Sequence, residues 1–231
     1  KGSVPETRSL LRYGADPLKQ TRDGRIPLHL AASEGHLEVA RILVQAAPSS
    51  PTLQTRTGRL ALHAAALAGH ADLVMMLLSV APDTLTVRDS SGTSPLLSAV
   101  ASGNLPLVQD ILHHYPLRIQ DECDDQGRNW AHLAAMTGHV SMLEEAIHHH
   151  VPMDLPDQWD HWTPLHHAVR YGRVQAVKFL LAAHADPTRR DRNGRSCTDI
   201  GKLICHPFPF TTSLSLFPDL SFLFHSHHVG P

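Results

Sequence analysis

The feature that most constrains this fold is a short phrase that returns along the chain at a nearly fixed interval. It begins at Gly24, Gly58, Gly92, Gly127 and His161, so that successive copies are 34, 34, 35 and 34 residues apart. A self-repeat of this length predicts a stack of small supersecondary units, each in contact with its neighbours. Such arrays present long surfaces to partners, and the chain is therefore expected to act by binding rather than by chemistry.

Each phrase opens a pattern that predicts two short helices separated by a tight turn. In the second helix, apolar residues recur at helical spacing, as at Val108, Ile111 and Leu112. Glycine, which tolerates a left-handed backbone, stands where the first helix should end, at positions 35, 69, 103, 138 and 172. Helices this short are marginal in isolation, so we expect them to persist only by packing against one another.

The repeated phrase resembles that of the ankyrin repeat family. It is complete at Thr163-Pro164-Leu165-His166, and Gly-His follows the first predicted helix at residues 35–36, 69–70 and 138–139. Gly14-Ala15-Asp16, after a predicted helix that ends in leucines, also fits the family. The resemblance covers roughly residues 1–205. It implies an all-α repeat solenoid of helix-turn-helix units with projecting β-hairpin loops, whose hairpins and first helices form a concave face.

The repeat register also predicts how the chain is divided. Residues 1–20 are expected to be a partial first repeat, consisting of a second helix and its loop, as in a fragment of a longer protein. The predicted segments that follow are repeats at 21–54, 55–88, 89–123, 124–157 and 158–190, a truncated last repeat at 191–205, and a non-repeat tail at 206–231. The tail holds five of the six phenylalanines and a single charge, and we expect it to be disordered.

The residue before each first helix differs between repeats. Ser94, Asn129 and Thr163 have side chains that can cap a helix, whereas Ile26 and Leu60 do not. A missing cap costs about 0.5–2 kcal/mol. On the sequence alone, replacing Ile26 or Leu60 by Thr is therefore expected to raise the melting temperature.

Composition excludes several function classes. The net charge of −2 gives no general attraction to nucleic acid or to acidic membranes. Three cysteines at irregular spacing, Cys123, Cys197 and Cys205, argue against a disulfide framework and favour a reducing compartment. The sequence shows no signal peptide and no apolar run of the about 18 residues that a membrane span needs. The predicted location is the cytoplasm or the nucleus.

The sequence predicts no catalytic, cofactor-binding or metal-binding residues. Of its nineteen histidines, seven occupy repeat positions, namely residues 29, 36, 63, 70, 132, 139 and 166. No Cys or carboxylate partners stand at the spacing of a zinc site, and there is neither a glycine-rich phosphate loop nor a nucleophile elbow. We therefore predict that the protein is not an enzyme.

The tips of the predicted hairpins hold the candidate partner-binding residues. These are Arg22, Arg25, Arg56, Arg59, Arg128, Trp159, Trp162, Tyr171, Arg192 and Arg195. The planar guanidinium of Arg suits carboxylates, and Trp and Arg are frequent binding hot spots. We therefore expect a monomeric, non-catalytic scaffold that holds an acidic protein segment along the concave face. The alternative is the substrate-targeting segment of a larger enzyme or ubiquitin-ligase adaptor, and nucleic acid and membranes are not expected partners.

Overall fold

The computed structural model describes residues 2–117 and 119–205, which fall into two compact units. Unit 1 comprises residues 1–126 and unit 2 comprises residues 127–231. The predicted tail at 206–231 lies outside the described residues. Each unit is a stack of paired α-helices, which confirms the all-α repeat architecture that the sequence predicts.

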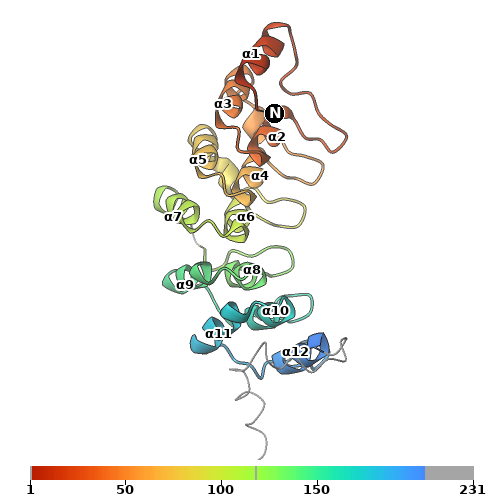
Figure 1. The fold of residues 1–231 in the computed structure, drawn as a ribbon, viewed down its shortest axis with the longest axis vertical. Coiled ribbons are helices and arrows are strands. Elements are labelled where there is room, and N and C mark those ends of the chain that lie inside the picture. The colour runs from red at the N-terminus through yellow and green to blue at the C-terminus, as the bar shows by residue number, and fades with distance from the viewer. Residues whose placement is uncertain (1, 118, 206–231) are drawn as a thin grey trace, which may run out of the picture. The chain divides into compact units, whose positions relative to one another are not determined.

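Unit 1 begins with a helix of the second type, and three helix pairs follow it. The first helices form one row: α2 (Pro27–Ser33), α4 (Ala61–Leu67) and α6 (Pro95–Ser102). The other row holds α1 (Val4–Arg12), α3 (Leu37–Ala46), α5 (Ala71–Val80) and α7 (Leu105–His114), with the 3-10 helices η1 (Ser50–Thr52) and η2 (Pro82–Thr86) after α3 and α5. Neighbours within a row pack on one another, and the loops ahead of the first helices project to one side (Figure 1).

Unit 2 has the same arrangement. Its first helices are α8 (Trp130–Thr137), α10 (Pro164–Arg170) and α12 (Cys197–Cys205), and its second helices are α9 (Val140–His148) and α11 (Val174–Ala182). α10 packs against both α8 and α12, and α11 packs against α9. Here too the loops ahead of the first helices project to one side (Figure 1).

Small and aliphatic side chains fill the space between the helices. In α2, Leu28 and Ala32 are fully buried, and in α4 the corresponding positions, Leu62 and Ala66, are buried to the same degree. The glycines that end the first helices have φ between 64° and 88°, as the sequence predicts. The projecting loops are tight turns rather than hairpin ladders, because the described residues contain no strand but only isolated bridge residues, such as the pair Arg190–Ser196.

In α2 and α4, the histidine of the phrase links the helix to the following loop. The Nδ1 of His29 accepts a hydrogen bond from the N–H of Ile26 at 3.3 Å, and its Nε2 lies 3.0 Å from the carbonyl oxygen of Arg59. His63 repeats this pattern with Leu60 and Thr93. An Nδ1 that accepts leaves the proton on Nε2, so the ring is neutral. Burial lowers the pKa of both histidines, which favours the same state.

The helix starts follow the sequence prediction only in part. Ser94 Oγ accepts from the N–H of Leu97, and Asn129 Oδ1 accepts from that of His132, each at 3.2 Å. Thr163 was expected to do the same, but its hydroxyl lies 2.9 Å from Nδ1 of His166 and caps no backbone N–H. Ile26 and Leu60 provide no cap, yet they are only 0% and 1% exposed.

The truncated last repeat forms a complete first helix. Although its phrase departs from the pattern, Ser196 and Asp199 bond reciprocally at the start of α12. The Ser196 N–H reaches Asp199 Oδ2 at 2.9 Å, and the Asp199 N–H reaches Ser196 Oγ at 3.3 Å. This capping box replaces the missing Thr-Pro start, and the Ser-x-x-Asp spacing was the signal for it.

Candidate functional site

Each projecting loop is held by the polar side chain at its first residue. In unit 1, the hydroxyls of Thr21 and Thr55 accept the N–H groups of Arg25 and Arg59, both at 3.1 Å. The next loop uses a carboxylate, since Asp89 Oδ1 accepts the N–H groups of residues 91 and 93 at 2.9 and 3.0 Å. In unit 2, Asp157 and Asp191 act in the same way. This Thr or Asp recurs just ahead of the repeat glycine and was not among the residues predicted from the sequence.

Consecutive loops within a unit are joined by one backbone hydrogen bond. In unit 1, the N–H of Arg56 donates to the carbonyl of Asp23 at 3.0 Å, and that of Ser90 donates to Thr57 at 2.9 Å. Gly24 is needed here because its φ is 79° and a Cβ would lie 2.9 Å from the Arg56 nitrogen. The loop tips are therefore held at a fixed spacing within each unit.

Arg59 is occupied within the protein. Its Nε lies 3.0 Å from Oδ2 of Asp89, whose side chain is 2% exposed. Burial opposes ionisation of this carboxyl, but Arg59 and the two loop amides outweigh it and hold the pKa of Asp89 below its ordinary value. Arg59 therefore serves the loop, and its charge is largely compensated.

The candidate residues of unit 2 are also largely engaged. Arg195 pairs with the buried Asp191 at 2.7 Å, and Trp162 Nε1 donates to the same carboxylate at 3.3 Å. Arg192 donates to the carbonyl of Gln158 at 2.9 Å, and the half-buried Arg128 also has an interaction within the protein. Burial opposes ionisation of Asp191, but the hydrogen bonds from Arg195, Trp162 and Asn193 outweigh it and lower the pKa of Asp191 to about 2.

Three of the predicted arginines keep their side chains available. Arg22, Arg25 and Arg56 are exposed, and within the described residues their guanidinium groups make neither an ion pair nor a hydrogen bond. The sequence explains the contrast with Arg59. The residue 30 positions after Arg59 is Asp89, but the residue 30 positions after Arg25 is Thr55, which has no charge to offer.

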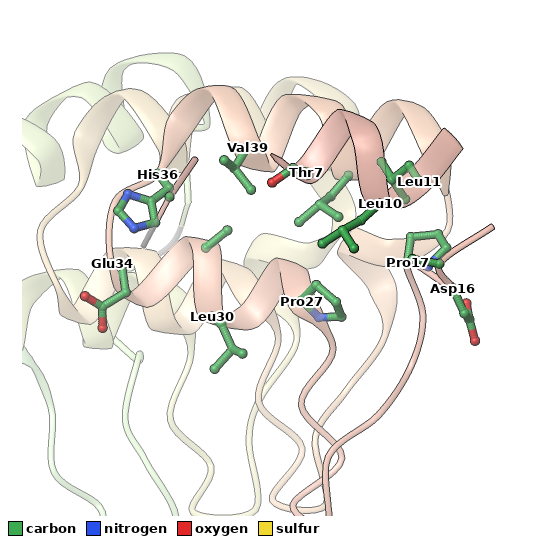
Figure 2. A pocket seen from close by; sticks show the side chains of 14 residues that line it. Thr7, Leu10, Leu11, Asp16, Pro17, Pro27, Leu30, Glu34, His36 and Val39 are labelled. Atoms are coloured by element: carbon green, nitrogen blue, oxygen red, sulfur yellow. The ribbon is translucent and has the colours of Figure 1, made fainter. Parts of the chain in front are cut away.

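Two leucines on the first helices of unit 1 are also exposed. Leu30 of α2 and Leu67 of α4 are 46% and 45% exposed, although most of the other apolar residues of these helices are buried. Leu30 points toward the side to which the loops run (Figure 2). We define the loop-side face of unit 1 as the surface formed by Leu30, Leu67 and the three available arginines. The leucines were not among the sequence candidates, because a single exposed Leu cannot be distinguished from core by spacing alone.

In unit 2, two of the three aromatic candidates are exposed, and the third is packed within the protein. Trp159 and Tyr171 are 64% and 50% exposed. Trp162 instead packs edge-on against His167, with ring centroids 5.2 Å apart, and Tyr171 stacks on that imidazole with ring centroids 6.5 Å apart. The Nε2 of His167 lies 3.0 Å from Asp157, so this cluster is tied to the loop. Trp159 and Tyr171 are the side chains that a partner could reach.

The described residues offer little for catalysis. Residues 2–117 and 119–205 contain no group of three or more His, Cys, Asp or Glu side chains arranged to hold a metal ion. Burial raises the pKa of the Cys197 thiol to about 12, which keeps it protonated and unreactive. None of the helices in this part of the chain has the length and apolar character that crossing a bilayer requires.

The repeats match a known family model and several known proteins. A family model described as ankyrin repeats (3 copies) matches residues 1–87, 47–121 and 96–191. Over 75 residues the chain is 36% identical to Ankyrin repeat and SAM domain-containing protein 6 of Mus musculus, which covers 32% of this chain and 8% of that protein. Over 71 residues it is 41% identical to the Transient receptor potential cation channel subfamily A member 1 homolog of Caenorhabditis elegans, with coverages of 30% and 6%.

A shorter match is closer in sequence. Over 38 residues the chain is 58% identical to the 2-5A-dependent ribonuclease of Mus musculus, which covers 16% of this chain and 5% of that protein. The matched stretches thus cover less than a tenth of each of these relatives. Repeats of this kind generally mediate protein–protein interaction and are not themselves catalytic.

Proposed function

The chain belongs to the ankyrin repeat family, and on that premise we propose that it is a non-catalytic scaffold that binds an acidic, leucine-bearing segment of another protein. The segment lies along the loop-side face of unit 1. The chain acts as a monomer in a reducing compartment, the cytoplasm or the nucleus, where the free thiols of Cys123 and Cys197 stay reduced.

One observation carries this proposal: unit 1 combines three available arginines in its loops with two exposed leucines on its first helices. Each guanidinium can donate two parallel N–H bonds to a carboxylate, which gives charge attraction as well as geometric selectivity. Burying the leucines adds an apolar contribution of about 25 cal/mol for each Å² removed from water. A partner that presents Glu or Asp beside apolar side chains matches both features.

Trp159 and Tyr171 supply a second contact in this proposal. Both are exposed aromatics of unit 2, and such side chains provide large contact areas with little conformational entropy to lose. They are proposed to anchor an apolar part of the partner. Arg59, Arg128, Arg192, Arg195 and Trp162, which make contacts within the protein, are assigned to loop structure instead.

The test uses a helix-forming peptide that carries Glu and Leu, and a matched peptide in which Gln replaces every Glu. The variant is Arg22→Ser, Arg25→Ser and Arg56→Ser together. We expect it to bind the Glu peptide about tenfold or more weakly than the wild type, with a flatter dependence of affinity on salt. Calorimetry of binding at two ionic strengths measures both quantities.

The matched control removes three exposed arginines elsewhere, by Arg8→Ser, Arg12→Ser and Arg170→Ser. It changes the net charge equally and leaves the loops untouched, so its affinity should stay close to that of the wild type. Equal weakening in the two triple variants would show a general charge effect and contradict the assigned face. Wild-type affinity in the loop variant would contradict it as well.

The second candidate function is a targeting segment within a larger enzyme or ubiquitin-ligase adaptor. It is favoured by the matched relatives, which are far longer than the stretches they share with this chain, and one of which is named a ribonuclease. The two candidates differ in what accompanies the repeats in the natural polypeptide. A targeting segment is purified from cells with catalytic or ubiquitin-transfer activity in the same chain, whereas a scaffold is purified with its bound partner only.

A further inference from the structure

The available positive charge of the unit 1 loops is concentrated at the first two loop tips. Arg22 and Arg25 lie on the first tip, and Arg56 lies on the second. Ahead of the third tip, Arg88 is already paired with Glu122 at 3.0 Å, and the loop that follows is acidic. A partner segment with carboxylates spread along its length would therefore meet cations at one end of this row of loops and acidic residues at the other.

The backbones of the first two tips are in contact. The carbonyl of Asp23 accepts the N–H of Arg56 at 3.0 Å, and a Cβ on Gly24 would lie 2.9 Å from the same nitrogen. Arg22 and Arg25 flank these two residues in the sequence, so that all three guanidinium groups extend from a small area of the surface. Of the residues described on these two tips, Asp23 alone carries a carboxylate, and the three cations outnumber it.

Each of these tips also offers a backbone N–H. In the third loop, Asp89 Oδ1 accepts the N–H groups that lie two and four residues after it. The hydroxyls of Thr21 and Thr55 accept only the second of these two groups. In the part of the chain that the structure describes, the N–H groups of Asp23 and Thr57 therefore have no protein acceptor. Backbone N–H groups beside arginines are donors that suit an anion.

We propose that the first two loop tips of unit 1 bind a phosphate monoester, which the partner segment carries as a phosphoserine. The inference rests on the function proposed above and specifies where the negative charge of the segment lies. A phosphoserine concentrates a charge of about −1.5 to −2 and three acceptor oxygens on one group, whereas a Glu carries a single charge on two oxygens. Three guanidinium groups and two N–H groups on adjoining tips match such a compact anion, and the planar fork of Arg fits phosphate oxygens in pairs.

The experiment compares three leucine-bearing peptides that differ at one position, which is phosphoserine, Glu or Ser. We expect the wild type to bind the phosphoserine peptide about tenfold or more tightly than the Glu peptide, and the Ser peptide most weakly. The variant with Arg22→Ser, Arg25→Ser and Arg56→Ser together should lose this preference, so that its affinities for the phosphoserine and Glu peptides differ by less than about twofold. Calorimetry of binding measures all of these affinities.

The control variant with Arg8→Ser, Arg12→Ser and Arg170→Ser should keep the wild-type preference. If the phosphoserine and Glu peptides bind equally well, and both bind better than the Ser peptide, the phosphate site is overturned and the proposed function stands. Equal affinities for all three peptides would contradict the proposed function as well. A phosphoserine preference that survives in the loop variant would overturn the assignment to these tips. Inorganic phosphate that binds as tightly as the phosphoserine peptide would assign the site to a free anion and overturn the proposal too.

Discussion

The first two loops of unit 1 and the last loop of unit 2 are closed by different kinds of side chain. Thr21 and Thr55 hold their turns with a neutral hydroxyl, and Arg22, Arg25 and Arg56 at the tips have no side-chain partner among the residues that the structure describes. Asp191 holds its turn with one carboxylate oxygen and uses the other to engage Arg195 and Trp162. The side chain that closes a loop thus decides whether the neighbouring cation is available.

This difference separates two roles that the sequence presents as one. An Arg next to the repeat glycine contributes to stability where a carboxylate stands within reach, as Arg59 does beside Asp89. The same residue type is free to bind a partner where the following loop begins with Thr, as Arg25 is ahead of Thr55. Stability should therefore respond to substitutions in the Asp loops, and binding should respond to substitutions in the Thr loops.

The largest effect is expected from Asp191→Ala. This change removes a buried acceptor of two loop N–H groups and leaves Arg195 and Trp162 Nε1 without their partner. Breaking such a network costs about 2–4 kcal/mol. Urea unfolding of the variant, followed by circular dichroism, measures the loss.

Thr21→Ala is the comparison from unit 1. It removes one exposed hydroxyl that accepts a single N–H, so we expect a loss of about 0.5–1 kcal/mol. If the two variants lose the same stability, the carboxylate adds nothing beyond turn closure, and the contrast between the loops fails.

A second effect concerns the helix starts that follow the loops. Considered for helix capping alone, Ile26→Thr and Leu60→Thr should stabilise the protein. Both original side chains are buried, however, so each change also removes apolar contacts and buries a hydroxyl. We expect a net loss of about 1–3 kcal/mol, which reverses the direction expected from the sequence. Thermal melting of each variant beside Ser94→Ala, which loses only a cap, gives the comparison. A raised melting temperature for either Thr variant would restore the capping argument.

The sequence was sufficient for the fold because the fold depends on periodicity. A 34-residue step, glycines at the helix ends and apolar residues at helical spacing are all local, and the structure confirms the paired helices they predict. The binding candidates were harder, because availability depends on a residue 30 positions away. Nothing near Arg59 in the sequence distinguishes it from Arg25, and the distinction lies in Asp89 and Thr55. The exposure of Leu30 and Leu67 likewise depends on which helix faces are left uncovered.

The third prediction concerns pH and applies to both units. Burial holds the pKa of His29, His63 and His166 below the ordinary 6.5, so the unfolded chain takes up protons first as pH falls. The free energy of unfolding should be highest above about pH 7 and should decline as pH falls through 6.5 toward the lowered pKa values. Urea unfolding at pH 7.5, 6.5 and 5.5 measures this slope.

The carboxylates do not complicate this range. The pKa values of Asp89 and Asp191 lie below the ordinary 3.8, so their contribution to stability is complete above that pH and is lost only under more acidic conditions. His63→Asn removes one of the titrating groups and should flatten the slope, whatever it does to stability at pH 7.5. A free energy of unfolding that is constant or rises between pH 7.5 and 5.5 would contradict the neutral, buried state of these histidines.

The smallest effect on stability, and the most direct test of the contrast between the loops, comes from exchanging their closing residues. Thr55→Asp places a carboxylate 30 positions after Arg25, which is the spacing of Arg59 and Asp89. Because the new ion pair is close to solvent, it should change the free energy of unfolding by less than about 1 kcal/mol. It should nevertheless weaken binding of the Glu peptide, since Arg25 would have an internal partner.

Asp89→Thr is the reciprocal change and should release Arg59. If the loop-side face binds through available arginines, the two variants must move affinity in opposite directions: Thr55→Asp weakens binding, and Asp89→Thr strengthens it once the fraction of folded protein is taken into account. Opposite shifts cannot come from a general loss of stability, because a loss of stability can only weaken binding. Both substitutions also leave the proposed binding residues in place. Shifts in the same direction would contradict control by the pairing of individual arginines, because the two substitutions change that pairing in opposite senses.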